Sequence, residues 1–146
     1  SFLSEPNDDR IRSRYFERDR DGALVGRVWY GPGAEGPPGH AHGGATAAVV
    51  DEVMGTAAWL AGHPVVAASI SVDFREMIPL GSIVRVEAAV REVDGRKIRV
   101  TGRLSDETGR AWAEGDGLFI EVETSELDDR LDAPLDGDMP TRFDAD

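Results

Sequence analysis

The sequence predicts an α+β fold in which a curved antiparallel sheet of about five to six strands wraps around one long helix. A single stretch of small, helix-forming residues occupies residues 43–61, and the later part of the chain alternates apolar and polar residues. Two Asp-Gly pairs, at residues 21–22 and 94–95, separate alternating stretches and are typical of hairpin turns. One apolar helix followed by consecutive antiparallel strands buries both elements if the sheet curves around the helix.

The predicted helix is apolar on almost every face, which indicates that it lies in the centre of the domain. Gly62-His63-Pro64 is expected to end it, because glycine suits a helix C-terminus and proline cannot continue one. The predicted strands are residues 14–19, 23–30, 65–76, 83–93, 97–104 and 110–122.

Composition divides the 146 residues into one domain with two extensions: an N-terminal extension (1–13), the domain (14–122) and an acidic C-terminal extension (123–146). The net charge of −12 argues against a general nucleic-acid-binding protein, which would present a basic face. No apolar run approaches 18 residues, so we do not expect a membrane span, and no basic, apolar, cleavable leader is visible at the start. The absence of cysteine removes disulfides and thiolate nucleophiles and is compatible with the cytoplasmic location that we expect.

The most informative motif is His42-Gly43-Gly44 at the start of the helix, followed by Asp51 within its apolar body. A glycine-rich helix start offers unpaired N–H groups to an oxygen anion. An acid on an apolar helix costs stability unless it is paired or exposed. Together they indicate acyl chemistry, with an oxyanion site and a carboxylate.

Gly43 and Asp51 are separated by eight residues, or about 12 Å along a helix. The two groups of one chain therefore cannot reach the same carbonyl. A shared site requires two antiparallel copies of the helix, which predicts a homodimer, or a dimer of dimers, with equivalent sites at the interface.

These residues, together with the stretch at residues 71–81 that ends in Pro79-Leu80-Gly81, resemble the hotdog-fold acyl-CoA thioesterases, and most of all their PaaI-like branch. The resemblance covers about residues 15–122. It implies that the Gly43 N–H polarises the thioester carbonyl and that Asp51 attacks the carbonyl or activates water. It also implies that His42 shapes the loop and hydrogen-bonds near the thioester.

Further residues are implied to bind an acyl-CoA substrate. Relatives carry a Ser or Thr beside the attacking water at the position of Ala67, so Ser69 or Ser71 substitutes for it or the water is held differently. The family places nucleotide contacts at the second Asp-Gly hairpin and near Arg75, at the end of the predicted strand at residues 65–76. The expected substrate-binding residues are His40, Gly44, Ser69, Arg75, Gly95, Arg96 and Lys97.

Other functions stay open at this point. A hotdog hydratase or dehydratase acting on acyl thioesters would be expected to carry a His a few residues after the acid, whereas here His42 precedes Asp51. A non-catalytic acyl-CoA-binding hotdog protein would be expected to lack the helix acid. His40 and His42 form a His-x-His pair, but only His63 remains as a third imidazole, so neither a metal nor another cofactor is expected. The negative net charge favours free acyl-CoA over an acyl group on an acidic carrier protein, although a local basic patch would override it.

Overall fold

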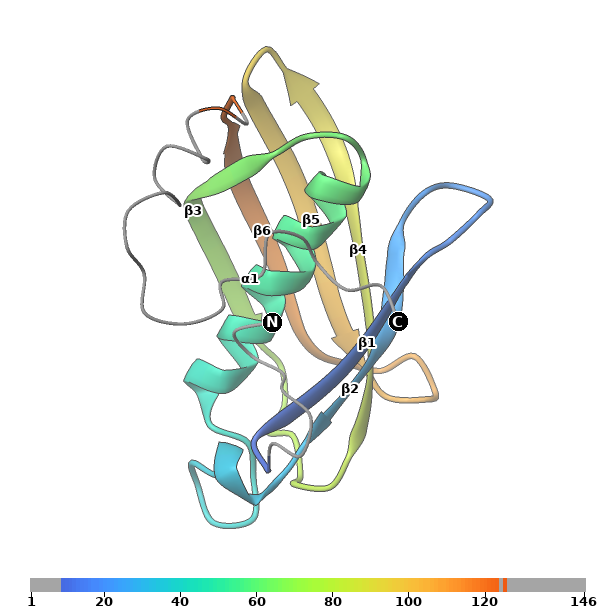
Figure 1. Cartoon of the computed structure of the whole chain (residues 1–146). Helices are drawn as coiled ribbons and strands as arrows, with labels where there is room; N and C mark the ends of the chain where they lie inside the picture. Colours follow the sequence, from blue (N-terminus) through green and yellow to red (C-terminus); the bar gives the residue numbers. More distant parts are fainter. Residues whose placement is uncertain (1–8, 124, 126–146) are drawn as a thin grey trace.

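The computed structural model describes residues 9–123 and 125, and it is a hotdog fold: a six-stranded antiparallel sheet curves around one long helix (Figure 1). The sheet order is β1-β2-β4-β5-β6-β3. The elements are β1 (Ile11–Glu17), β2 (Leu24–Tyr30), η1 (Pro32–Ala34), α1 (Gly43–Leu60), β3 (Val65–Phe74), β4 (Ile83–Asp94), β5 (Lys97–Ser105) and β6 (Ala111–Glu121). The predicted helix and the six predicted strands are confirmed, and the acidic extension falls outside the described residues except for 123 and 125.

The first strand begins at Ile11, three residues before the predicted start. Ile11 pairs with Tyr30 at the end of the β1–β2 hairpin, and both side chains are buried. The sequence around Ile11 alternates too weakly to show this, because Ile11 and Tyr15 are the only buried residues of β1. Residues 11–13 therefore belong to the sheet.

Helix α1 lies against the inner face of the sheet, where fully buried side chains such as Val50 and Met54 form the core. Three glycines in β5 and β6 allow this close approach. A Cβ atom on Gly115 would lie 2.4 Å from Val50 Cγ1, and one on Gly102 would lie 2.9 Å from Met54 Cγ. A Cβ atom on Gly117 would collide with the Phe119 ring. The helix can therefore rest on backbone where other sheets carry side chains.

Strand β3 forms one edge of the sheet and pairs only with β6 in the described chain. A bulge at Ala68 shifts the register, so Ala67 pairs with the buried Phe119 and Ser69 pairs with Leu118. Because directly paired residues share a face, Ala67 faces α1 and Ser69 faces away from it.

The two ends of the sheet carry different loops. The α1 N-terminus lies beside the loops after β2 and β3, where Gly81 donates to the Tyr30 carbonyl (2.7 Å) and Ala41 to the Ile78 carbonyl (2.8 Å). The β4–β5 hairpin lies at the opposite end, beside the α1 C-terminus, where Glu121 donates to the Arg96 carbonyl (Figure 1). No helix in the described ranges is long and apolar enough to span a membrane.

Replacing Gly115 by Ala tests the contact between helix and sheet. The added methyl group would displace the stiff, fully buried Val50, and overpacking of this kind costs about 1–3 kcal/mol of unfolding free energy. We expect urea unfolding to show that loss. Gly55→Ala is the matched control, because its Cβ meets only an ordinary contact of 3.7 Å to Phe119 and alanine favours the helix by about 0.5–1 kcal/mol. Equal effects of the two substitutions would contradict the packing argument.

Candidate active site

The α1 N-terminus begins with a histidine cap. His42 is the N-cap residue, and its Nδ1 accepts a hydrogen bond from the Gly44 N–H at 2.8 Å. A ring that accepts at Nδ1 carries its proton on Nε2 in the neutral form, and His42 is exposed, so Nε2–H is available as a donor. The neighbouring Gly43 N–H has no hydrogen-bond partner within the described ranges. The positive end of the helix therefore presents a backbone donor with a histidine beside it.

The loop before the helix is held by its own polar groups. Glu35 Oε2 accepts from the Gly39 N–H at 2.9 Å, and His40 Nδ1 lies 2.9 Å from the Pro38 carbonyl oxygen. His40 also forms a β-bridge with Pro79 in the loop after β3. His40 thus lies two residues before the helix cap, with its Nδ1 already engaged inside the loop.

Asp51 lies two turns into α1 and is half-buried. Its carboxylate has no hydrogen bond or ion pair with any described residue, and burial raises its pKa above the usual aspartate range. Adjacent Glu52 differs, because it accepts a hydrogen bond from the Tyr15 hydroxyl at 2.9 Å. Burial, followed by the charge of Glu52, raises the pKa of Tyr15 and keeps it neutral. Of these two neighbouring acids, Glu52 is tied to the sheet and Asp51 is left available.

The strand that borders Asp51 offers no hydroxyl on the α1 side. Its residues facing α1 are all apolar: Val65, Ala67, Ile70, Val72 and Phe74. Ser69 and Ser71 pair with Leu118 and Asp116 on the opposite face, so neither lies on the side of Asp51 in the same chain. The expectation that Ser69 or Ser71 replaces the hydroxyl missing at Ala67 is therefore wrong for the described chain, because the bulge at Ala68 sets the two faces.

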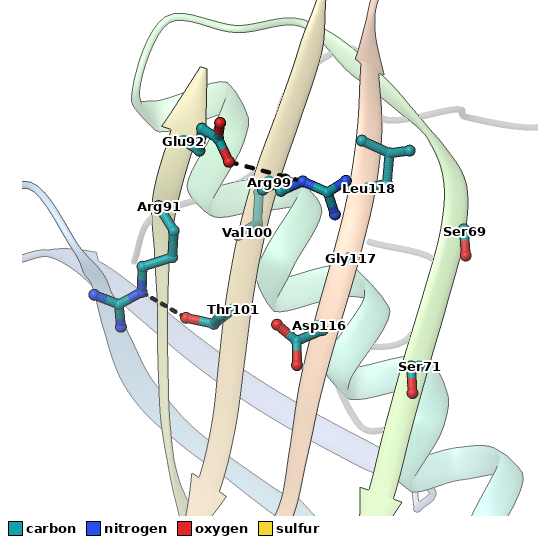
Figure 2. A pocket seen from close by; sticks show the side chains of 10 residues that line it. All are labelled: Ser69, Ser71, Arg91, Glu92, Arg99, Val100, Thr101, Asp116, Gly117 and Leu118. Atoms are coloured by element: carbon teal, nitrogen blue, oxygen red, sulfur yellow. Dashed lines mark hydrogen bonds and ion pairs between the residues drawn. The ribbon is translucent and has the colours of Figure 1, made fainter. Parts of the chain in front are cut away.

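Ser69 and Ser71 instead line a hollow of about 380 Å³ on the outer face of the sheet. Figure 2 shows these side chains on the near side of strands β3 to β6, with α1 behind them. Two of its arginines contact other residues that line the hollow: Arg91 Nε donates to Thr101 Oγ1 at 2.7 Å, and Arg99 Nε lies 3.8 Å from Glu92 Oε2. Alternating polar residues of β3, β5 and β6 were visible in the sequence, but only their register shows that they meet.

The residues predicted to bind the nucleotide separate into two groups. Arg75 follows β3 at the end of the molecule that holds Gly43, where its guanidinium is half exposed and lies 3.9 Å from Asp73 and Glu114 oxygens. Gly95, Arg96 and Lys97 form the hairpin at the other end, where Arg96 Nε donates to the Glu121 carbonyl at 3.0 Å. One chain does not bring them together with Gly43. Among the described residues, no group of three His, Asp or Glu side chains is placed to hold a metal ion.

Comparison with known protein families gives a match over about half of the chain. Residues 38–113 match the model of the thioesterase superfamily, a span that includes His42, Gly43, Asp51 and the loop after β3. The chain belongs to the thioesterase superfamily.

The chain also resembles individual proteins, one of which is named an acyl-coenzyme A thioesterase. Acyl-coenzyme A thioesterase THEM5 of Mus musculus is 32% identical over 97 residues, which are 66% of this chain and 39% of the relative, so the chain spans about two fifths of its length. The Escherichia coli PaaI protein from the phenylacetic acid degradation operon shares the fold with a TM-score of 0.66 at 17% identity, covering 70% of this chain and 75% of that one. A Streptococcus mutans protein crystallised with acetyl-CoA does so with a TM-score of 0.69 at 14% identity, covering 82% of this chain and 93% of that one.

Asp51→Asn should change how stability depends on pH. Burial raises the folded-state pKa of Asp51 above its unfolded value, so ionisation penalises the folded state. This penalty is absent below the unfolded value of about 3.9, grows as the pH rises and is complete above the folded pKa. We expect Asp51→Asn to be more stable than the wild type at pH 7, with the difference closing as the pH falls toward 4 in urea titrations.

Glu52→Gln is the control for that titration. Its carboxylate is bound by Tyr15, so its removal is expected to give no gain at pH 7. A wild-type protein that is more stable than Asp51→Asn at pH 7 would show that Asp51 has a stabilising partner.

Proposed function

We propose that the chain is an acyl-CoA thioesterase that works as a homodimer, with each active site formed by Gly43 of one protomer and Asp51 of its partner. The observation that carries this proposal is that one uninterrupted helix holds an N–H donor and a carboxylate, neither of which is paired with a described residue. They lie about 12 Å apart, so each is useful only opposite the complementary group of a second helix.

The exposed edge of the sheet supports the dimer. Among the described residues, β3 pairs along one edge only, and its α1-side residues Ile70 and Phe74 are 39% and 56% exposed. An exposed edge with apolar side chains is a template for pairing with another strand. Two β3 strands related by a two-fold axis pair antiparallel, which extends the sheet and sets the two α1 helices antiparallel on the same face.

The position of that axis follows from the helix. A Cβ on Gly43 would lie 3.9 Å from the Phe74 ring, so Gly43 is level with the end of β3. Asp51, about 12 Å further along, is level with a residue three to four positions earlier in β3. For one Gly43 to face the partner subunit's Asp51, the axis passes close to Val72.

The same symmetry explains the separated nucleotide residues. An antiparallel pairing brings the partner subunit's Arg96 and Lys97 to the end of the molecule that carries Gly43 and Arg75. The phosphates of CoA would then meet cations from both protomers. This supports the substrate-binding roles of Arg75, Gly95, Arg96 and Lys97, which a single chain does not unite.

The proposed hydrolysis of the thioester uses the N–H donors at the helix start and the Asp51 carboxylate. The thioester carbonyl oxygen accepts from the Gly43 N–H, with His42 Nε2–H as a neighbouring donor, and these donors stabilise the oxyanion that develops. Asp51 either adds to the carbonyl carbon to form a mixed anhydride, which water hydrolyses, or removes a proton from the attacking water. In both routes the C–S bond breaks, the thiolate takes up a proton, and free acid and CoA leave. The pKa of Asp51, raised by burial, makes it a stronger base than an ordinary aspartate.

Gly43→Pro removes the proposed donor while leaving the helix start intact. Proline is favoured at the first helical position, and His42 already has the extended conformation (φ −65°, ψ 138°) that precedes proline. We expect hydrolysis of acetyl-, palmitoyl- and phenylacetyl-CoA, followed with a thiol reagent, to fall about 10²–10³-fold in kcat. Asp51→Asn should lower it about 10²–10⁴-fold.

Gly43→Ala keeps the N–H and Glu52→Gln keeps Asp51, so both controls should retain activity. Mixing Gly43→Pro with Asp51→Asn subunits under exchange conditions should restore about a quarter of the wild-type activity, because half the dimers are mixed and each has one intact site. No recovery in confirmed heterodimers would exclude shared sites. No thiol release by the wild type on any substrate would exclude the thioesterase itself.

Single cysteines in β3 locate the axis, since the native chain has no cysteine. Directly opposed residues of antiparallel strands lie about 4.5–5.5 Å apart at Cα, within reach of a disulfide. In a scan from Ile70 to Phe74, we expect oxidative cross-linking to peak at Val72 and to fall on both sides. A monomer in solution, or a peak outside residues 71–73, would contradict this arrangement.

A further inference from the structure

The outer face of the sheet carries a row of three arginines that the sequence does not reveal. Arg14 pairs directly with Arg27, and Arg27 pairs directly with Arg85, on the neighbouring strands β1, β2 and β4. All three side chains are exposed. With strands about 4.8 Å apart, the row extends about 10 Å across the sheet.

The charges of this row are not balanced by the described part of the chain. None of the three arginines forms a hydrogen bond or ion pair with a described residue, although acids outnumber bases 28 to 16 in the sequence. Where β1, β2 and residues 83–88 of β4 pair with one another, Glu87 is the one acid on the outward face, and it binds Arg18 at 3.1 Å. Glu92 and Asp94 lie on the same face further along β4, beyond its pairing with β2. Like charges directly opposite one another destabilise a sheet. The row therefore has a cost that an anionic partner would remove.

Apolar and aromatic side chains surround the row on the same face. Phe16 of β1 is 49% exposed and Ile83 of β4 is 53% exposed. Arg12 stacks over the Trp29 ring at 4.9 Å from its centroid. Arginine next to exposed aromatic side chains is typical of protein–protein interfaces. We call Arg14, Arg27 and Arg85, with Phe16 and Ile83, the arginine surface.

The arginine surface lies at the end of the sheet that holds the candidate active site. Arg27 is three residues before Tyr30, and Arg85 is four residues after Gly81, whose N–H donates to the Tyr30 carbonyl. The adjoining loop leads directly to His42 and Gly43. A long flexible arm anchored at the arginine surface would pass around this end of the sheet to reach Gly43.

We propose that the arginine surface docks an acidic carrier protein, which presents the acyl group as a thioester on its phosphopantetheine arm. The inference rests on the proposed thioesterase function and names a second form of its substrate. Water adds to the acyl carbon, the C–S bond breaks, and the products are the free acid and the carrier with a free thiol. A lipid surface is less suitable, because the outer face of the curved sheet is convex and meets a flat bilayer over a narrow strip.

Steady-state kinetics with one acyl group on three carriers tests the proposal. The substrates are the acyl thioesters of an acidic carrier protein, of CoA and of pantetheine. Reversing the row (R14E/R27E/R85E) should lower kcat/KM at least ten-fold for the carrier protein, mainly through KM, and change it less than two-fold for CoA and pantetheine. The loss should shrink as salt is added.

Two further variants serve as controls. R20E/R99E/R110E makes the same change in net charge at exposed arginines outside the arginine surface and should leave all three activities unchanged. R14Q/R27Q/R85Q removes the repulsion within the row, so it should fold at least as well as the wild type and still lose carrier preference. Circular dichroism and size-exclusion chromatography confirm fold and oligomeric state.

Each other outcome overturns the inference. Equal losses on CoA and carrier protein, with pantetheine unaffected, would assign the row to nucleotide phosphates. A wild type that hydrolyses carrier protein and pantetheine thioesters equally well would exclude docking. Binding to phosphatidylserine vesicles that R14E/R27E/R85E abolishes, with unchanged carrier kinetics, would assign the row to a lipid surface. No hydrolysis of any thioester would instead remove the proposed function itself.

Discussion

One helix has to cover the inner face of a six-stranded sheet, and the rest of the structure depends on this constraint. A helix with its side chains is about 10–12 Å wide, whereas six strands extend about 24 Å. The sheet closes part of the gap by curving, and Gly102, Gly115 and Gly117 let α1 sink onto the backbone of β5 and β6. Within the described residues, the edge strand β3 stays uncovered, with Ile70 and Phe74 exposed. The proposed dimer would cover this edge with a second copy of the same strand.

Because the helix and the sheet do not cover each other completely, the apolar helix can carry a carboxylate that is only half-buried. A fully buried Asp51 would need a partner, and a fully exposed one would have an ordinary pKa. Half-buried and unpaired, it keeps a raised pKa at a cost in stability. The fold can supply a hydrogen-bond donor to an acid at this position of the helix, since the Tyr15 hydroxyl donates to Glu52. Asp51 receives no such donor from the described chain. A half-buried carboxylate without a partner conflicts with the stability of the fold, and conflicts of this kind are typical of functional sites.

Local patterns in the sequence were enough to predict the helix, the positions of the strands along the chain and the hairpin turns, because apolar periodicity and Asp-Gly pairs act over a few residues. They also identified Gly43 and Asp51, whose separation along one helix is fixed by sequence distance. Simple alternation places Ala67 and Ser69 on the same side of β3, whereas the bulge at Ala68 puts them on opposite sides, and the sequence pattern does not reveal this bulge. The arginine row could not be predicted either, because Arg27 and Arg85 meet only through the register of β2 with β4, which are far apart in the chain.

Because strand register decides which charges lie together, the net charge of the chain does not describe the charge of each of its faces. Summed over the sequence, −12 suggests a protein that repels acidic partners. At physiological ionic strength, however, exposed charges interact over about 8 Å, so a partner responds to the face it approaches rather than to the total. Arg14, Arg27 and Arg85 lie within about 10 Å of one another and have no described acid bound to them. An acidic partner that approaches this face meets a local cluster of cations, whose attraction distant carboxylates hardly weaken. The proposed preference for an acidic carrier protein over CoA therefore depends on strand register, because the register brings the three arginines together.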